Sequence, residues 1–332
     1  MRIGIEAPAV AVTVIGALGW LARAGAAGAE EVSPLDIPNL SPPVAVFGLP
    51  AWDGPLGDAR NEFSITTAVG NHYVLAGNGH EELLVDGETW RVNLAYRHRF
   101  GERWAVSLGV PWYRHSGGFL DDAVDAWHGF TNLPDGNRNL RGEDELRYLY
   151  KVGGRHRFLF ERSGQGIGDV RLGLSRTVGV EGATTLKATL KVPTGDRGAL
   201  TGSGATDLAL SFLRRHSLTG GDAPAGIYWG AGVLRPGESE VFSLPSEDWV
   251  VFGVLGAGWQ PLQRLGFKAQ LDAHSNYFSS SLDELGASAV QASVGGWWIS
   301  DSGRTLTFAF SEDLIVKSAP DFGIHIGLGW TF

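Results

Sequence analysis

The chain ends in Asp321-Phe-Gly-Ile-His-Ile-Gly-Leu-Gly-Trp-Thr-Phe332, and this stretch decides the fold. Its apolar side chains recur at every second residue from Phe322 to Phe332, and small or polar residues fill the positions between them. Successive side chains of a β-strand point to opposite faces, so the alternation predicts a strand with one apolar face.

The same stretch carries a spaced motif at its end. A polar residue, a glycine and two aromatic residues stand at His325, Gly327, Trp330 and Phe332. This order resembles the C-terminal β-signal by which outer-membrane barrels are recognised and closed. We therefore expect these four residues to form a barrel-closing signal that engages the barrel-assembly machinery through the last strand.

The first residues have the features of an export signal. Arg2 precedes an apolar core, and Ala24-Gly25-Ala26 and Ala27-Gly28-Ala29 offer small-x-small cleavage sites. The apolar core is too short to cross a bilayer as a helix, which takes about 20 residues. We expect residues 1–29 to be a signal peptide that is removed on export.

Residues 30–60 are rich in proline. Proline removes donors from a strand ladder, so this stretch predicts an extended periplasmic arm rather than part of a sheet. Its apolar part, Val44 to Pro50, is expected to dock at the periplasmic mouth of the barrel or to enter the lumen.

Twelve segments with period-two alternation follow. They cover 61–71, 83–100, 103–115, 165–179, 183–194, 205–216, 225–236, 249–260, 264–278, 287–299, 304–315 and 322–332. Most are longer than the roughly 5–6 residues of an ordinary soluble strand, and a tilted membrane strand needs about 9–11.

Short and long connections alternate along these segments. Five connections are short, whereas long ones are expected at 72–82, 116–164, 195–204, 237–248, 279–286 and 316–321. Short turns on one side and long loops on the other are typical of a bacterial outer-membrane barrel whose termini share the periplasmic side. Because backbone groups in lipid need partners, such a sheet has to close.

The sequence therefore predicts an all-β fold. We expect a transmembrane antiparallel up-and-down β-barrel of about 12 strands over residues 61–332, embedded in the bacterial outer membrane with the lipid bilayer as its first partner. The long loop 116–164 is expected to contain a helix.

Composition and charge narrow the function classes. The chain has 27 Lys and Arg against 36 Asp and Glu, a formal net charge of −9, which argues against nucleic acid as a partner. No cysteine is present. We expect no cofactor and no metal.

Charged residues on the polar face of the segments are expected to line the lumen. They could form a selectivity lining or a salt-bridged filling of the interior, and both readings stay open. The expected lining residues are Arg91, Arg97, Arg99, Asp169, Arg171, Lys187, Lys191, Asp207, Lys268, Asp272, His274 and Glu312.

The long loop has apolar residues at helical spacing. A helix over 119–131 is expected either to form a constriction across the mouth or in the lumen, or to pack on the outer rim. The residues of the expected loop constriction are Phe119, Leu120, Val124, Trp127, His128 and Phe130.

His274-Ser275-Asn276 invites comparison with outer-membrane phospholipases, which use Ser, His and Asn on a barrel of the same strand number. Neighbouring strand residues point to opposite faces, so His274 and Ser275 do not share a site without a bulge. A lipid-modifying enzyme is therefore the least favoured interpretation, and we expect no enzyme.

Several stretches together resemble a known family. They are Phe47-Gly48-Leu49-Pro50, Gly118-Phe119-Leu120-Asp121 with Trp127-His128, Leu133-Pro134-Asp135-Gly136, Gly166-Ile167-Gly168-Asp169, and Ser311-Glu312-Asp313-Leu314 before Pro320-Asp321-Phe322. Their order resembles the uncharacterised bacterial family known as domain of unknown function three-one-eight-seven. That resemblance implies an exported outer-membrane barrel and no established activity.

These observations give two leading hypotheses of function. The first is a channel or uptake pore for small solutes. The second is a structural or scaffold barrel with a filled lumen that binds an envelope partner.

Overall fold

The computed structural model describes residues 33–54, 59–120, 144–179, 183–218, 224–239, 241–314, 319–320 and 322–332. Fifteen strands of this part join one antiparallel sheet. They are β1 (Asn61–Gly77), β2 (Glu81–Phe100), β3 (Trp104–Ser116), β4 (Arg147–Val152), β5 (Arg155–Phe160), β6 (Gly164–Ile167), β7 (Val170–Val178), β8 (Thr184–Val192), β9 (Asp207–Leu218), β10 (Ala225–Arg235), β11 (Val250–Leu262), β12 (Leu265–His274), β13 (Ala289–Ile299), β14 (Thr305–Asp313) and β15 (Phe322–Thr331).

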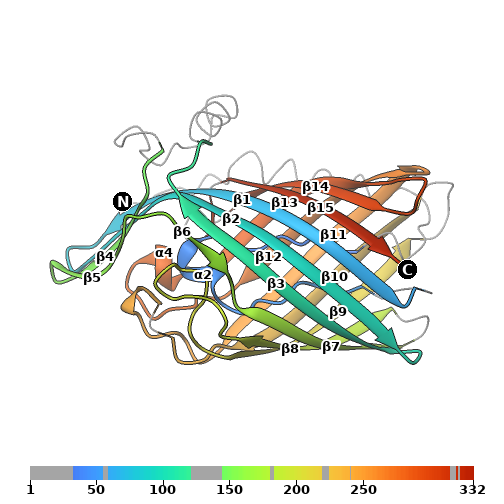
Figure 1. The fold of residues 1–332 in the computed structure, drawn as a ribbon, viewed down its shortest axis with the longest axis horizontal. Coiled ribbons are helices and arrows are strands. Elements are labelled where there is room, and N and C mark those ends of the chain that lie inside the picture. Colours follow the sequence, from blue (N-terminus) through green and yellow to red (C-terminus); the bar gives the residue numbers. More distant parts are fainter. Residues whose placement is uncertain are drawn as a thin grey trace, which may run out of the picture.

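Thirteen of these strands close into a barrel of twelve, because β6 and β7 are two pieces of one barrel strand (Figure 1). The last strand, β15, pairs with the first, from Glu62 opposite Thr331 to Asn71 opposite Phe322. Each remaining barrel strand pairs with its neighbours in the chain. The predicted closed antiparallel barrel of twelve strands is confirmed.

One barrel strand is interrupted. β6 pairs with the end of β3, from Trp112 opposite Ile167, and β7 pairs with the first half of β3, from Trp104 opposite Arg176. Gly168 separates the two pieces, and its N–H donates to the carbonyl of Pro111. A Cβ at Gly168 would lie 2.6 Å from the Tyr113 ring, so this close approach requires glycine.

The first two strands extend beyond the barrel. β1 reaches Gly77 and β2 begins at Glu81, with Gly77 opposite Glu82. The predicted long loop at 72–82 is therefore wrong, because strand pairing continues almost to the tip. A hairpin of β4 and β5 continues this extension, since β4 pairs with Glu81–Asp86 of β2.

The outer wall is apolar. Large apolar side chains on this face are exposed, such as Leu108 at 40%, Phe310 at 48% and Ile326 at 52%. A water-soluble fold would bury such a continuous apolar surface. The alternation that the sequence shows therefore sorts apolar side chains to the outside of the ring.

The short helical elements lie away from the strands of the wall. They are α2 (Pro42–Ala45), η3 (Val241–Ser243) and α4 (Asp283–Gly286). Pro42 stands in the first turn of α2, where its missing N–H costs no hydrogen bond. In the described part of the chain, no helix has the length and apolar character to cross a membrane.

Candidate functional site

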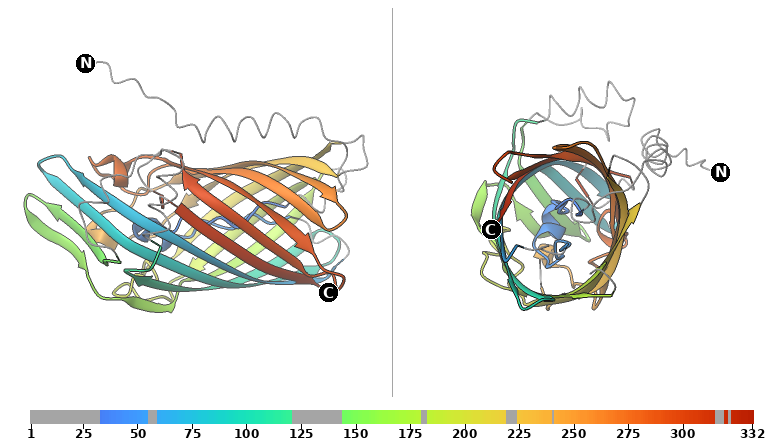
Figure 2. Two further views of the ribbon diagram at one scale, coloured as in Figure 1. Left: turned by 90° about the horizontal axis from the view of Figure 1, so that it is seen from above. Right: turned by 90° about the vertical axis from the view of Figure 1, so that its right-hand side faces the viewer.

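Residues 33–54, here called the lumenal arm, lie inside the barrel. Looking along the barrel axis, Figure 2 shows this blue segment within the ring of strands. The carbonyl of Ser33 accepts from Lys268 near the start of β12, and Asn39 contacts His274 at the end of the same strand, with 2.9 Å between Nδ2 and Nε2. The first limb therefore runs along the lumen from the end where β15 terminates.

The second limb of the lumenal arm returns along the opposite wall. The Phe47 carbonyl accepts a hydrogen bond from Arg171, and the Gly54 carbonyl accepts one from Arg97. The stretch 30–60 was expected to be a periplasmic arm whose apolar part, Val44 to Pro50, docks at the mouth or enters the lumen. In the structure, residues 33–54 lie in the lumen.

Six cationic side chains of the wall donate to the lumenal arm. Two of them bind carboxylates: Arg91 lies 3.3 Å from Asp36, and Lys187 lies 2.7 Å from Asp53. The others bind backbone carbonyls. These four donors are Arg97, Arg171, Lys191 and Lys268.

Lys191 is the most enclosed of these cations, with a side chain that is 0% exposed. Its Nζ lies 2.7 Å from an oxygen of Asp169 and 3.1 Å from one of Asp207. It also donates to the carbonyl of Val46 at 3.1 Å. A buried charge is tolerated only when it is paired and hydrogen-bonded, and both carboxylates meet that need here.

Neutral polar side chains complete the attachment. Gln270 accepts from the N–H of Leu35 at 2.8 Å and donates to the Leu35 carbonyl at 3.1 Å. Tyr113 donates to the carbonyl of Ala45. Gln270 and Tyr113 were not among the expected lining residues, although both lie on inward-facing positions of their strands.

An apolar cap lies at the end of the lumen opposite to the end where β15 terminates. The Phe47 ring stacks on Tyr277 with 4.7 Å between centroids and meets the edge of Phe278 at 5.6 Å. Outer segments pack around this tip of the lumenal arm. The cap includes Val44, Val46, Phe47, Leu83, Val85, Tyr148, Tyr150, Phe242, Leu244, Tyr277, Phe278, Leu282 and Leu285.

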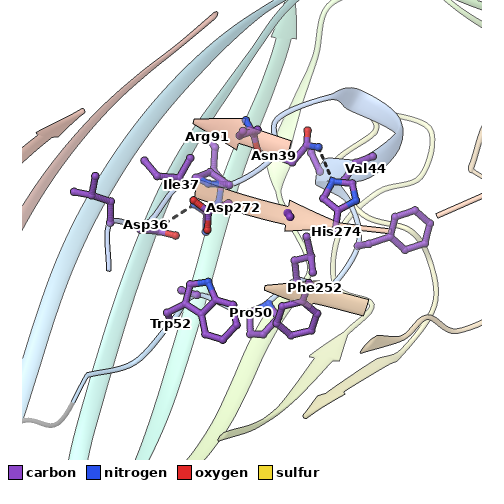
Figure 3. Close-up of a pocket in the computed structure, with 18 of the residues that line it drawn as sticks. Asp36, Ile37, Asn39, Val44, Pro50, Trp52, Arg91, Phe252, Asp272 and His274 are labelled. Atoms are coloured by element: carbon purple, nitrogen blue, oxygen red, sulfur yellow. Dashed lines mark hydrogen bonds and ion pairs between the residues drawn. The ribbon is translucent and has the colours of Figure 1, made fainter. Parts of the chain in front are cut away.

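A cavity of about 70 Å³ remains between the two limbs (Figure 3). Asp36, Asn39, Arg91, Asp272 and His274 are among its polar lining residues. Pockets for drug-sized ligands hold roughly 300–1,000 Å³, so this cavity has room for water and not for a larger solute. The two limbs therefore leave little free space between them.

Asp36 belongs to the lumenal arm and not to a strand of the wall. Burial alone would raise the pKa of its carboxyl group. The charge of Arg91 and hydrogen bonds from Thr66 and Arg91 outweigh burial and lower the pKa of Asp36 below its ordinary value of 3.8. The carboxylate is therefore ionised at neutral pH and holds the first limb by charge.

Asp272 and Arg99 lie on inward-facing positions, as expected. Asp272 accepts a hydrogen bond from Gln270 at 2.7 Å, and Arg99 lies half-buried near the end of β2. Glu312 was expected in the lumen, but it stands opposite Phe322 and shares the outer face with Phe310. The inner position belongs to Asp313, which is 7% exposed.

The start of the long loop lies against the outside of the barrel. Leu120 packs on Val69 and Ile324, and Phe119 lies 5.9 Å from Trp90. Phe119 and Leu120 were expected to form a constriction, and these contacts contradict that expectation. Both side chains pack on outward-facing residues of the wall, outside the lumen. Val124, Trp127, His128 and Phe130 lie outside the described residues.

The four residues of the expected closing signal fall on β15. His325 is buried on the inner face and lies 2.8 Å from the Ser311 hydroxyl. Gly327 stands opposite Thr66 and Thr307. Trp330 packs on Phe63 with 4.8 Å between ring centroids, and Phe332 exchanges backbone hydrogen bonds with Asn61.

The structure does not bring His274 and Ser275 together in one site. His274 contacts the lumenal arm, whereas Ser275 accepts a hydrogen bond from the N–H of Val251 through its hydroxyl. Among the residues the structure describes, no group of three His, Cys, Asp or Glu side chains could hold a metal ion.

A family model described as Protein of unknown function (DUF3187) matches residues 10–332. The chain belongs to this family. The match covers nearly the whole sequence and confirms the resemblance that the spaced motifs indicate. No curated protein sequence is significantly similar to this chain.

Solved structures of outer-membrane barrels are similar to this family member. The COG4313 outer membrane channel from Pseudomonas putida F1 has a TM-score of 0.55 at 14% identity, covering 91% of this chain and 100% of that one. The translocator domain of the autotransporter NalP from Neisseria meningitidis has a TM-score of 0.42 at 10% identity, covering 83% and 89%. The P. putida toluene transporter TodX has a TM-score of 0.39 at 9% identity, covering 83% and 90%. The first likeness shows the fold.

Proposed function

We propose that this protein is an outer-membrane channel for small solutes and that the lumenal arm holds it closed. The observation that carries the proposal is that hydrogen bonds and ion pairs hold the arm to the wall. Six cationic side chains and the amide of Gln270 bind the arm along its length. Water and solute can replace such polar contacts more readily than close-packed apolar contacts, so the arm can leave the wall.

The outer face supports the location. Exposed apolar side chains surround the ring, and no polar residue is needed to satisfy the backbone because the ladder closes on itself. With an export signal at 1–29 and a closing signal on β15, we place the barrel in the bacterial outer membrane. The lipid bilayer and the barrel-assembly machinery are its proposed partners, and the likeness to a solved outer-membrane channel agrees.

The long loop receives a revised role in this proposal. Instead of a constriction built by a helix, the β4–β5 hairpin contributes Tyr148 and Tyr150 to the apolar cap. We propose that the cap and the lumenal arm form one closure, because the tip of the arm packs directly on it. No catalytic step is assigned to any of these residues.

A disulfide tether tests the closure in the full-length chain, which has no cysteine of its own. A Cβ at Gly70 of β1 would lie 3.2 Å from the Cβ of Leu40 in the lumenal arm. Disulfides need roughly 3.5–4.5 Å between Cβ atoms, so a small shift brings a Leu40→Cys/Gly70→Cys pair into range.

The readout is single-channel current in planar bilayers. We expect the unmodified protein to open intermittently, the oxidised double variant to stay closed, and a reductant to restore the openings. The Leu40→Cys variant alone is the control and should open under both conditions. Openings that persist in the oxidised double variant would show that the arm does not gate the pore.

The second candidate is a scaffold barrel that binds an envelope partner at its rim. The small cavity of about 70 Å³ and the apolar cap favour this reading, since both leave the lumen filled. A scaffold would remain without conductance as long as residues 33–54 are present, and it would capture a partner from intact envelopes by cross-linking. The bilayer measurement therefore separates the two functions.

A further inference from the structure

We propose that the open lumen selects small anionic solutes, carboxylates in particular, and that the lumenal arm occupies their path as a tethered mimic. This inference rests on the proposed channel function and names its substrate class. It follows from the charge of the inner wall, from the chemistry of the arm and from the way the two meet.

The inner wall carries an excess of positive charge. Cross-strand partners share a face, so the strand registers sort the described side chains into inward and outward positions. Eight basic residues face inward against five acidic ones. The basic residues are Arg91, Arg97, Arg99, Arg171, Lys187, Lys191, Arg215 and Lys268, and the acidic ones are Glu62, Asp169, Asp207, Asp272 and Asp313.

This balance is opposite in sign to that of the whole chain. The wall has a net charge of three positive when histidines are neutral, whereas the full sequence has a formal net charge of −9. The acidic majority of the sequence therefore lies elsewhere. A concentration of basic side chains inside the barrel sets the sign of the field along the lumen.

The lumenal arm offers these cations only oxygen atoms and negative charge. Between residues 33 and 54 the sequence contains Asp36 and Asp53 and no lysine or arginine. Asp36 binds Arg91, and Asp53 binds Lys187. The carbonyls of Ser33, Ala51 and Gly54 accept further donors of the wall. The arm thus presents carboxylate and carbonyl oxygens to the wall, as a carboxylate-bearing solute would.

The cations form a series along the axis of the barrel. Lys187 and Lys191 lie on the same face of β8, about 13 Å apart at a rise of roughly 3.3 Å per residue. Arg91 and Arg97 lie on the inner face of β2, about 20 Å apart at the same rise per residue. An anionic solute that leaves one cationic side chain can therefore bind the next one along the axis, as conduction through a selective pore requires.

Acidic side chains temper this field without cancelling it. Glu62 binds Arg97, and Asp169 and Asp207 both bind Lys191. These pairs reduce the local affinity for an anion, so a solute can leave each position. Arg91, Arg171, Lys187 and Lys268 have their described partners mainly in the arm, and they gain free donors when the arm leaves.

The test needs an open pore without a change of charge, and Gly48→Val supplies one in the full chain. A Cβ at Gly48 would lie 3.1 Å from the Cβ atoms of Lys191 and Asp207, so the larger side chain pushes the arm off the wall. Reversal potentials across a potassium chloride gradient, and then a potassium acetate gradient, measure selectivity. We expect chloride and acetate to permeate severalfold better than potassium.

Removing wall charge on this background should reduce the preference. Gly48→Val with Arg91→Gln and Lys187→Gln is expected to bring the permeability ratio toward one. Gly48→Val with Arg214→Gln is the matched control, because Arg214 is exposed on the outer face of β9. Conductance that prefers potassium, or that ignores Arg91 and Lys187, would overturn the anion proposal and leave the channel standing.

A second variant covers the case in which Gly48→Val does not assemble. Deleting residues 33–54 exposes the same wall, and a synthetic peptide of that sequence should block its current. The same peptide with Asp36→Asn and Asp53→Asn should block it less strongly. Equal block by both peptides contradicts the mimicry, whereas absence of any current contradicts the proposed function itself.

Discussion

The N–H of Gly48 donates a hydrogen bond of 2.8 Å to Oδ2 of Asp207, which stands 159 residues later in the chain. The other oxygen of this carboxylate accepts from the N–H of Gly237 at 2.9 Å. One carboxylate therefore joins the lumenal arm, the wall and an outer loop, and it also pairs with Lys191 at 3.1 Å. A substitution at this junction therefore affects the lumenal arm, the wall and the outer loop together.

A side chain at Gly48 is expected to loosen the lumenal arm. Its Cβ would lie 3.1 Å from two Cβ atoms and 3.2 Å from the Asp207 carboxylate, tighter than side chains normally tolerate. Gly48→Val should therefore raise the open probability in planar bilayers. Gly329→Ala is the control, because its nearest atoms lie 3.9 Å away. A closed pore in both variants would place the gate elsewhere.

Removing the carboxylate of Asp207 should destabilise the barrel strongly. Asp207→Ala leaves Lys191 buried with one partner fewer, and breaking a buried pair costs about 3–5 kcal/mol. Thermal unfolding followed by gel mobility should show a large fall in midpoint. Lys151→Ala provides the comparison, since its pair with Glu82 is exposed and contributes about 1 kcal/mol or less. Equal effects would mean that the buried junction is not a stability determinant.

The alternation of side chains predicted the wall well because alternate residues of each strand face the outside and the lumen, so the pattern is local to each strand. In β15 the inner His325 and Gly327 alternate with the outer Ile326 and Leu328, and pairing with β1 and β14 keeps the same two faces. The extension of β1 and β2 escaped detection for the same reason. Tyr73, Val74 and Leu75 are consecutive apolar residues, and without alternation they do not read as a half-buried strand.

The sequence of the β4–β5 hairpin carries a hairpin signal. Gly153-Gly154 separates two runs that each contain two aromatic residues, which is a hairpin pattern. The apolar spacing between Phe119 and Phe130 drew the interpretation toward a helix instead. Only Phe119 and Leu120 of that stretch are described, and they contact the outer wall.

The position of the lumenal arm could not be read from its own residues. Proline and isolated aspartates indicate an extended segment, but Asp36 meets Arg91 across 55 residues, and Gly48 meets Asp207 across 159. These partners come together only after the sheet has closed. The sequence therefore predicts which cations line the wall and that the arm is extended. Which wall residue contacts which arm residue becomes visible only in the folded structure.

Acid should weaken the hold of the lumenal arm. The pKa of Asp36 is lowered in the folded state, so its contribution is complete above the ordinary value of 3.8 and is lost as the pH falls through the lower folded value. We expect open probability to rise between neutral pH and pH values below the ordinary pKa. The bilayer current at both pH values is the measurement.

The Asp36→Asn variant isolates this effect from other titrating groups. It should open more often than the unmodified protein at neutral pH and should respond less to acid, because its side chain cannot lose the charge. Glu82→Gln, an exposed position outside the lumen, should behave like the unmodified protein. An unchanged acid response in Asp36→Asn would assign the pH dependence to another carboxylate.

Charge on the outer wall is expected to obstruct membrane insertion according to depth. Phe308 stands in the middle of β14, is 39% exposed and lies opposite Ile326, so Phe308→Arg places a cation among apolar side chains near the centre of the barrel wall. An arginine at the bilayer midplane costs about 2–4 kcal/mol, and one near the interface costs about 0–1 kcal/mol. Leu262→Arg, beside the short turn after β11, is the interfacial counterpart. Urea titration of both variants folded into liposomes should separate them by this difference. Equal midpoints would mean that lipid does not surround the wall, and this result would contradict the proposed membrane location of the channel.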